Sequence, residues 1–192
     1  MGYQRNNEIY PSVTEIIKRV SQFKDSKPGP AAHIGTLLHY HILKQYRKLP
    51  APILQIWGVD EQEVFNRLSN GLQMWRKLNL NFKPIYVEEI FYDDHFKFAG
   101  KVDLLAEIDD DIVVIDLKTG DYYEEYLLQM AAYSRLTSSD YAMIIKLDLN
   151  TQRNPNSEPS IKYFCKDELN SAFRRFLEIL EDYRKNLNIR QR

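Results

Sequence analysis

Only one cysteine, Cys165, occurs among the 192 residues of the sequence. A single thiol excludes an intramolecular disulfide framework, a zinc site built from several cysteines and a four-cysteine iron–sulfur cluster within this chain. No apolar run approaches the roughly 20 residues that a membrane-spanning helix needs, and residues 1–10 lack the apolar core of a signal peptide. We therefore expect no membrane contact and a cytoplasmic protein, or one of the host cytoplasm if the source is a virus.

An excess of charge of one sign is also absent. The 26 lysines and arginines are balanced by 27 aspartates and glutamates, which gives a net charge of −1. A nucleic-acid-binding protein of this composition has to concentrate its cations locally. The 44% hydrophobic and 28% charged content is ordinary for a globular protein,. We predict a single domain over residues 1–192, with a core at about 10–150 and a C-terminal strand and helix within 158–188.

The stretch 98–133 carries the strongest local pattern. It predicts a strand, a tight turn at 109–111, a second strand and then a helix,. The continuous apolar run 112–115 is typical of a strand buried on both faces. Asp116 and Lys118 follow it two residues apart, so they point to the same side of the sheet. A charged pair at the end of a buried strand is costly unless it is paired or binds a metal.

The turn at 109–111 brings the strand of Asp103 beside the strand of Asp116. Two adjacent carboxylates repel each other unless a proton or a cation lies between them. Their hard oxygen atoms suit Mg²⁺ or Mn²⁺, which also bind phosphate groups. A bound metal ion acidifies water and stabilises charge on a phosphoryl oxygen, and Lys118 can orient that water, help deprotonate it or neutralise the phosphate. The pattern favours phosphodiester hydrolysis, while a structural Asp–Lys ion pair remains the alternative for so short a motif.

Four short motifs follow one another along the chain: GTLLH at 35–39, GKVD at 100–103, DLKTG at 116–120 and QMAAY at 129–133. Together with YPSVTEII at 10–17, this ordered set resembles the RecB-like branch of the PD-(D/E)xK nuclease superfamily, in particular its small phage, viral and mitochondrial-genome-maintenance exonucleases. The resemblance covers about residues 10–150. It implies an α/β fold with a restriction-endonuclease-like αβββαβ core, in which helices flank a mixed central sheet.

The resemblance also implies roles for individual residues. It assigns metal binding to His39, Asp103, Asp116 and the backbone carbonyl of Leu117, catalysis to Asp103, Asp116, Lys118 and Glu88, and substrate binding to Gln129, Tyr133 and Thr119. The four-residue spacing of Gln129 and Tyr133 places them on one helix face. His41 has no counterpart in the motif, and it lies about 200° around the helix from His39, so the two cannot face one site.

Two positions leave the assignment open. Glu88 and Glu89 interrupt the strand predicted at 85–92, and alternation would point them to opposite faces,. The resemblance favours Glu88 at the site, with Glu89 as the alternative, and both could instead be charges that protect a sheet edge. Ile34 stands where many relatives have an arginine before the glycine, which puts one phosphate contact in doubt.

Elsewhere the pattern predicts helices at 12–23, 31–48, 59–78, 122–137 and 168–187 and strands at 85–92, 141–149 and 160–165,. Ser12 is expected to cap the first helix and Asp167 the last. Trp57 and Trp75 are expected in the core.

The sequence therefore predicts a DNA nuclease that depends on Mg²⁺ or Mn²⁺ and holds no iron–sulfur cluster. Exonuclease action on DNA that is single-stranded or has single-stranded ends is favoured, because the most similar relatives thread single strands. An endonuclease that cuts single strands, flaps or junctions is the first alternative, and a DNA-binding module without catalysis or a sugar- or protein-binding module are others. The cutting polarity, the choice of DNA over RNA, the oligomeric state and the pathway are left open.

Overall fold

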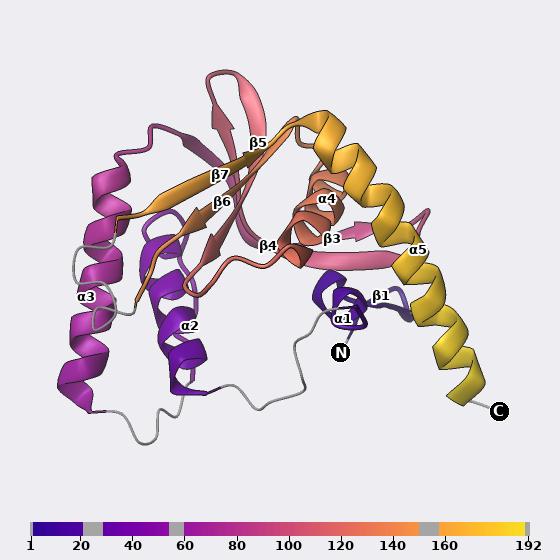
Figure 1. Ribbon diagram of the computed structural model, residues 1–192, viewed down its shortest axis with the longest axis horizontal. Coiled ribbons are helices and arrows are strands. Elements are labelled where there is room, and N and C mark those ends of the chain that lie inside the picture. Colours follow the sequence, from indigo (N-terminus) through magenta and orange to yellow (C-terminus); the bar gives the residue numbers. More distant parts are fainter. Residues whose placement is uncertain (1, 21–28, 54–59, 150–157, 191–192) are drawn as a thin grey trace.

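The computed structural model describes residues 2–20, 29–53, 60–149 and 158–190 (Figure 1). The helices in these ranges are α1 (Val13–Ile17), α2 (Pro30–Leu43), α3 (Glu61–Leu78), α4 (Glu125–Thr137) and α5 (Lys166–Arg190). The strands are β1 (Tyr3–Arg5), β2 (Glu8–Tyr10), β3 (Lys83–Asp93), β4 (Phe98–Ile108), β5 (Asp111–Lys118), β6 (Tyr141–Lys146) and β7 (Ser160–Phe164). No helix among the described residues is long and apolar enough to cross a membrane.

The molecule has three layers. Its central sheet has the strand order β3-β4-β5-β6-β7, in which β5 and β6 are parallel and the other neighbouring pairs are antiparallel. Helices α2 and α3 lie on one face of this sheet, and α1, α4 and α5 lie on the other (Figure 1). The order α2, β3, β4, β5, α4, β6 is the predicted αβββαβ core, and the predicted mixed sheet between helices is confirmed.

Each face of the sheet has its own apolar cluster. Strand β5 serves both clusters, because Val113, Ile115 and Leu117 pack with the α2–α3 layer while Val114 packs with the α1–α4–α5 layer. This arrangement explains why the run is continuously apolar, as expected for a strand covered on both sides. Asp116 alternates with Leu117 and therefore points toward α4.

The β4–β5 hairpin is tight. Asp109 and Asp110 form its turn, and both have left-handed backbone angles, with φ of 49° and 69°. Two successive left-handed residues give the turn whose twist matches that of the strands, and aspartate tolerates this conformation better than most residues. The predicted turn is confirmed, and it sets the register that brings the two candidate carboxylates together.

Several predicted element ends are wrong. The predicted first helix ran to residue 23, whereas α1 ends at Ile17, and residues 21–28 lie outside the described part. The second helix ends at Leu43, five residues before the predicted end, and turns follow before Pro50. The final helix starts at Lys166, so Asp167 lies inside its first turn, and the Glu168 carboxylate instead accepts from the Cys165 amide at 2.9 Å.

Other local predictions are confirmed. Ser12 caps α1 by accepting a hydrogen bond from the Glu15 amide at 3.2 Å. The strand β7 returns antiparallel beside β6, as expected for a hairpin partner. Trp75 is buried in the core, while Trp57 lies outside the described residues.

Candidate active site

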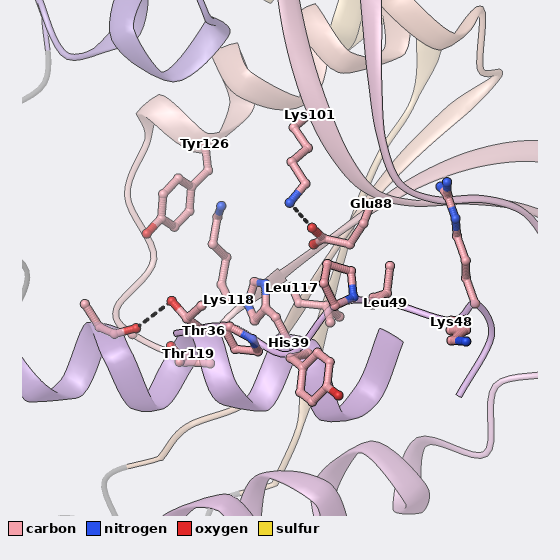
Figure 2. A pocket seen from close by; sticks show the side chains of 17 residues that line it. Thr36, His39, Lys48, Leu49, Glu88, Lys101, Leu117, Lys118, Thr119 and Tyr126 are labelled. Carbon is pink, nitrogen blue, oxygen red and sulfur yellow. Dashed lines mark hydrogen bonds and ion pairs between the residues drawn. The ribbon is translucent and has the colours of Figure 1, made fainter. Parts of the chain in front are cut away.

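A cavity of about 620 Å³ opens where α2 crosses the ends of the central strands (Figure 2). Helix α2 contributes Gly35, Thr36, His39 and Tyr40 to its wall, β5 and the following turn contribute Leu117, Lys118 and Thr119, β3 and β4 contribute Glu88 and Lys101, and α4 contributes Tyr126. The segment after α2 adds Arg47, Lys48, Leu49 and Pro50. Three of the four motifs found in the sequence thus supply residues to a single cavity, and a residue of the fourth, Gln129, contacts Lys118.

Asp103 and Asp116 meet across neighbouring strands. Leu104 pairs with Ile115 in the β4–β5 ladder, so the next pair outward sets Asp103 opposite Asp116. Asp103 Oδ2 accepts a hydrogen bond from the Leu117 amide at 2.9 Å. Burial would raise the pKa of Asp103, but the His39 imidazole, the Lys118 ammonium and the Leu117 amide together outweigh burial and lower it. Burial raises the pKa of Asp116 above its usual value, although Lys118 opposes that rise.

Lys118 is held from three sides. Its Nζ atom lies 2.5 Å from Asp116 Oδ2 and donates to Gln129 Oε1 at 3.1 Å. The same atom lies 4.6 Å from the centre of the Tyr126 ring, within the range of a cation–π contact,. Burial alone would lower the pKa of Lys118, but the Asp116 carboxylate, followed by Asp103, raises it. The side chain is therefore an oriented ammonium group at the cavity wall.

Gln129 links the lysine to the acid. Its amide nitrogen donates to Asp116 Oδ1 at 3.2 Å and to the Tyr133 hydroxyl at 3.0 Å. The predicted common face of Gln129 and Tyr133 is thereby confirmed. Burial, and then the Asp116 carboxylate, raises the pKa of Tyr133 well above its usual value. Both residues are buried, so they act on the cavity through the groups that line it.

His39 approaches the acids from the opposite layer. Its Nδ1 atom lies 3.4 Å from Asp103 Oδ2. Burial would lower the pKa of His39, but the Asp103 carboxylate and then the Asp116 carboxylate together outweigh burial and raise it. His41 makes an edge contact with the Tyr40 ring and does not line the cavity, which agrees with the predicted helical geometry.

Two motif glycines permit close approach of helices to the sheet. A Cβ atom at Gly35 would lie 2.6 Å from Thr119 Oγ1, so α2 can rest against the end of β5 only without a side chain there. A Cβ atom at Gly100 would lie 2.7 Å from the Tyr133 ring on α4. These contacts give a packing reason for the glycines of GTLLH and GKVD.

Glu88, and not Glu89, lines the cavity. Glu88 has φ of 53° in the middle of β3, which breaks the alternation that the sequence predicted for the two glutamates. Its carboxylate pairs with Lys101 (Figure 2), whereas Glu89 accepts from Arg47 Nη1 at 2.6 Å. Ile34 is fully buried in the α2–α3 cluster, so this position offers no phosphate contact.

The donor atoms suit a hard divalent cation. Asp116 Oδ2 is buried and makes no hydrogen bond of ordinary geometry within the described ranges, although the Lys118 ammonium is its charged neighbour. Those ranges hold no group of three His, Cys, Asp or Glu side chains placed to enclose an ion by themselves. Mg²⁺ commonly takes one or two protein carboxylates and completes its shell with water and substrate phosphates. The pair Asp103 and Asp116, with His39 beside it, fits that requirement.

The lining residues that were not predicted from the sequence include Arg47, Lys48, Lys101 and Tyr126. Lys101 lies inside the GKVD motif, and Tyr126 precedes Gln129 by three residues, which is a neighbouring position on one helix face. The sequence positions of Lys101 and Tyr126 relative to these motifs could therefore have identified both as candidate site residues. Arg47 and Lys48 fell in a stretch predicted as helix, and their place at the cavity depends on where α2 ends.

Comparison with known proteins gives a family match. A sequence model of the PD-(D/E)XK nuclease superfamily matches residues 16–184. No curated protein matches the chain. Similar solved structures include a phage-related exonuclease from Haemophilus somnus 129PT, with 13% identity, a TM-score of 0.44 and coverage of 95% of this chain and 96% of the other. An alkaline exonuclease from Laribacter hongkongensis has 11% identity, a TM-score of 0.44 and coverage of 95% and 93%.

Proposed function

The chain belongs to the PD-(D/E)XK nuclease superfamily, and from that membership we propose that it is a metal-dependent deoxyribonuclease that degrades single-stranded DNA from an end. The observation that carries the proposal is the convergence of Asp103, Asp116, Lys118 and His39, of which Lys118 and His39 line the cavity. A cavity of about 620 Å³ is in the range that holds one small ligand,. That volume suits an unpaired nucleotide at the end of a strand.

Asp103, Asp116 and His39 would hold the metal ion, and the Leu117 carbonyl would add a backbone ligand. Mg²⁺ or Mn²⁺ bound there would polarise the scissile phosphate and lower the pKa of a water molecule. The site residues do not depend on the ion for their placement, because the β4–β5 register fixes the two carboxylates and the Leu117 amide fixes the Asp103 rotamer.

Lys118 would neutralise a phosphate oxygen and orient the attacking water. Its ammonium group is kept charged by Asp116 and aimed by Gln129, so it needs little reorganisation when the substrate enters,. Glu88 stands on the other side of the cavity as a further carboxylate for the reaction. Thr119 would contact the substrate strand, since it lines the cavity directly after Lys118.

The test is digestion of end-labelled linear single-stranded DNA and of circular single-stranded DNA, each with Mg²⁺, with Mn²⁺ and with chelator. We expect loss of the linear strand alone, only with metal, and no activity in Lys118→Ala or Asp116→Ala. Lys166→Ala is the matched control, because Lys166 lies near Asp140 at the opposite end of β5. Cutting of the circle would replace exonuclease with endonuclease, and binding of DNA without cleavage would leave a non-catalytic module.

A further inference from the structure

The cavity concentrates positive charge in a chain of net charge −1. Its wall carries Arg47, Lys48, Lys101 and Lys118 together with the Glu88 carboxylate, while Glu89, Asp103 and Asp116 pair with lining residues from outside the wall. We propose that Lys48 and Lys101 form a phosphate-binding wall for the DNA strand, and that Glu88 limits this wall by occupying Lys101. The inference rests on the proposed function, since the ligand is the phosphodiester backbone of the substrate.

Lys48 is available to an incoming phosphate. It is exposed at the cavity, and it has no ion-pair partner within the described ranges. The neighbouring Arg47 is fixed, because its Nη1 atom donates to the Val87 carbonyl at 2.8 Å and to Glu89 at 2.6 Å. Leu49 packs against the α2–α3 cluster on the other side. Lys48 therefore projects from an anchored segment, and no ion pair within the described ranges neutralises its ammonium group.

The positive charge of Lys101 is neutralised by an ion pair within the cavity. Its ammonium pairs with the Glu88 carboxylate, and the Lys101 side chain is still 46% exposed (Figure 2). The left-handed backbone at Glu88 is one that residues other than glycine seldom adopt, and such conformations are kept where the surroundings enforce them,. A phosphate that binds Lys101 has to compete with Glu88, whereas a phosphate at Lys48 does not.

The two lysines line the same cavity as His39 and Lys118. In Figure 2 Lys48 lies on the far side of the cavity from Tyr126, and Lys101 reaches in toward Glu88. Contacts of lysine with phosphates position a strand without reading its sequence. Each such contact that is lost reduces the salt dependence of binding to single strands by about 0.7 in the log–log slope.

The experiment measures binding of a fluorescent oligothymidylate by anisotropy in chelator, where no metal-dependent cleavage takes place, over a series of salt concentrations. The proteins are wild type, Lys48→Ala, Lys48→Glu, Lys101→Ala, Glu88→Gln and the double variant Glu88→Gln/Lys101→Ala. We expect Lys48→Ala to weaken binding several-fold and to lower the salt slope, with a larger loss for Lys48→Glu. We expect Lys101→Ala to weaken binding, because it leaves the Glu88 carboxylate unpaired in the cavity, and Glu88→Gln to tighten binding several-fold through the released lysine.

The double variant carries the decisive comparison, because the gain from Glu88→Gln should vanish once Lys101 is gone. A double variant that binds more tightly than wild type, or a Lys48→Ala protein that binds like the control Lys166→Ala, overturns the proposal. Wild type that shows no binding in chelator also overturns it. Digestion of the same oligonucleotide with Mg²⁺ or Mn²⁺ is measured in parallel: cleavage by wild type leaves the nuclease assignment standing in each of these cases, and absence of cleavage removes that assignment as well.

Discussion

Among single residues, Gln129 connects Lys118, Asp116 and Tyr133 through one side-chain amide. Its oxygen accepts from Lys118 while its nitrogen donates to Asp116 and Tyr133. The amide is suited to this position because it is both donor and acceptor. A glutamate would place a third carboxylate beside Asp103 and Asp116, and an aliphatic side chain would release the lysine. We therefore propose that Gln129 is a positioning residue, which acts on substrate through Lys118.

Replacing Gln129 with methionine tests this role. The variant should keep the side-chain volume but leave Lys118 less well aimed, and misplacement by about 1 Å can cost roughly 100-fold in rate. We expect single-turnover cleavage to slow by about that factor, while KM for DNA changes little. Tyr133→Phe is the milder companion, since it removes only the hydroxyl that Gln129 donates to. A raised KM with an unchanged cleavage rate would place Gln129 in substrate binding.

Tyr183 gives a residue-level prediction about pH. Its hydroxyl donates to Glu15 at 2.7 Å and ties α5 to α1. Burial, and then this hydrogen bond, raises the pKa of Tyr183 from 10.0 to about 12. The folded protein thus holds the proton more tightly than the unfolded chain does. The stabilisation is complete below about pH 10 and is lost as the pH rises toward about 12.

Urea unfolding of wild type and Tyr183→Phe at several pH values measures that loss. Near neutral pH the variant should be less stable by about 1.5–3 kcal/mol, the usual contribution of a hydrogen bond to a charged group. The difference should shrink through the alkaline range, because only wild type has this proton to lose. The variant retains the other twelve of the 13 tyrosines, so their ionisation cancels in the comparison. A difference that stays constant with pH would contradict the assignment.

At the scale of elements, the close contact of α2 with the end of β5 brings His39 to the acids. Gly35 lies one helical turn before His39 and leaves room for Thr119 Oγ1. The contact is short enough that a methyl group at Gly35 has to push the helix or turn the threonine. The placement of the histidine thus depends on a glycine that takes no part in the chemistry.

Gly35→Ala should destabilise the protein by about 1–3 kcal/mol, the usual cost of overpacking, despite the better helix propensity of alanine. In a Thr119→Ala background the penalty should largely disappear, because the next nearest atom, Thr119 Cβ, is 3.7 Å away. Chemical unfolding of the two single variants and the double variant gives the coupling energy. Gly120→Ala is the control, since nothing lies within 4 Å of a Cβ there. Additive effects would show that Thr119 does not oppose the new methyl group.

For the whole molecule, the central sheet lies between two apolar clusters, and its strands contribute side chains to both of them. Phe176 on α5 is fully buried in one cluster, 5.0 Å from the ring of Phe98. Trp75 on α3 is buried in the other. Since β4 and β5 contribute side chains to each cluster, we propose that the chain unfolds as one domain.

Phe176→Ala tests the single domain. The substitution should lower the free energy of unfolding by about 3–5 kcal/mol. In a Trp57→Phe background, fluorescence reports Trp75 alone, and its transition should shift as far as the transition seen by circular dichroism,. Cleavage at low temperature should persist, because Phe176 does not line the cavity. If the unfolding midpoint reported by Trp75 fluorescence does not shift, the chain contains two folding units and the proposal is wrong.

The sequence by itself determined the order of the αβββαβ core elements and several of the residues that gather at the candidate site. The apolar run 112–115, the turn at 109–110 and the spacing of Asp116 with Lys118 are local features, and local spacing fixes which side of a strand or helix a residue occupies. The ordered motifs then identified the family. Helix ends were less well predicted, because turns after Leu43 depend on packing that a helical pattern does not report.

Only the tertiary structure decided which of Glu88 and Glu89 lines the cavity, that Ile34 is core, and that Lys48 and Lys101 line the same cavity. Alternation predicts side-chain direction only in a regular strand, and the left-handed backbone at Glu88 breaks it. Residues 47, 48 and 101 are separated by up to 54 positions, so no local pattern relates them. Their proximity follows from how α2 crosses the sheet, which is set by packing over the whole molecule.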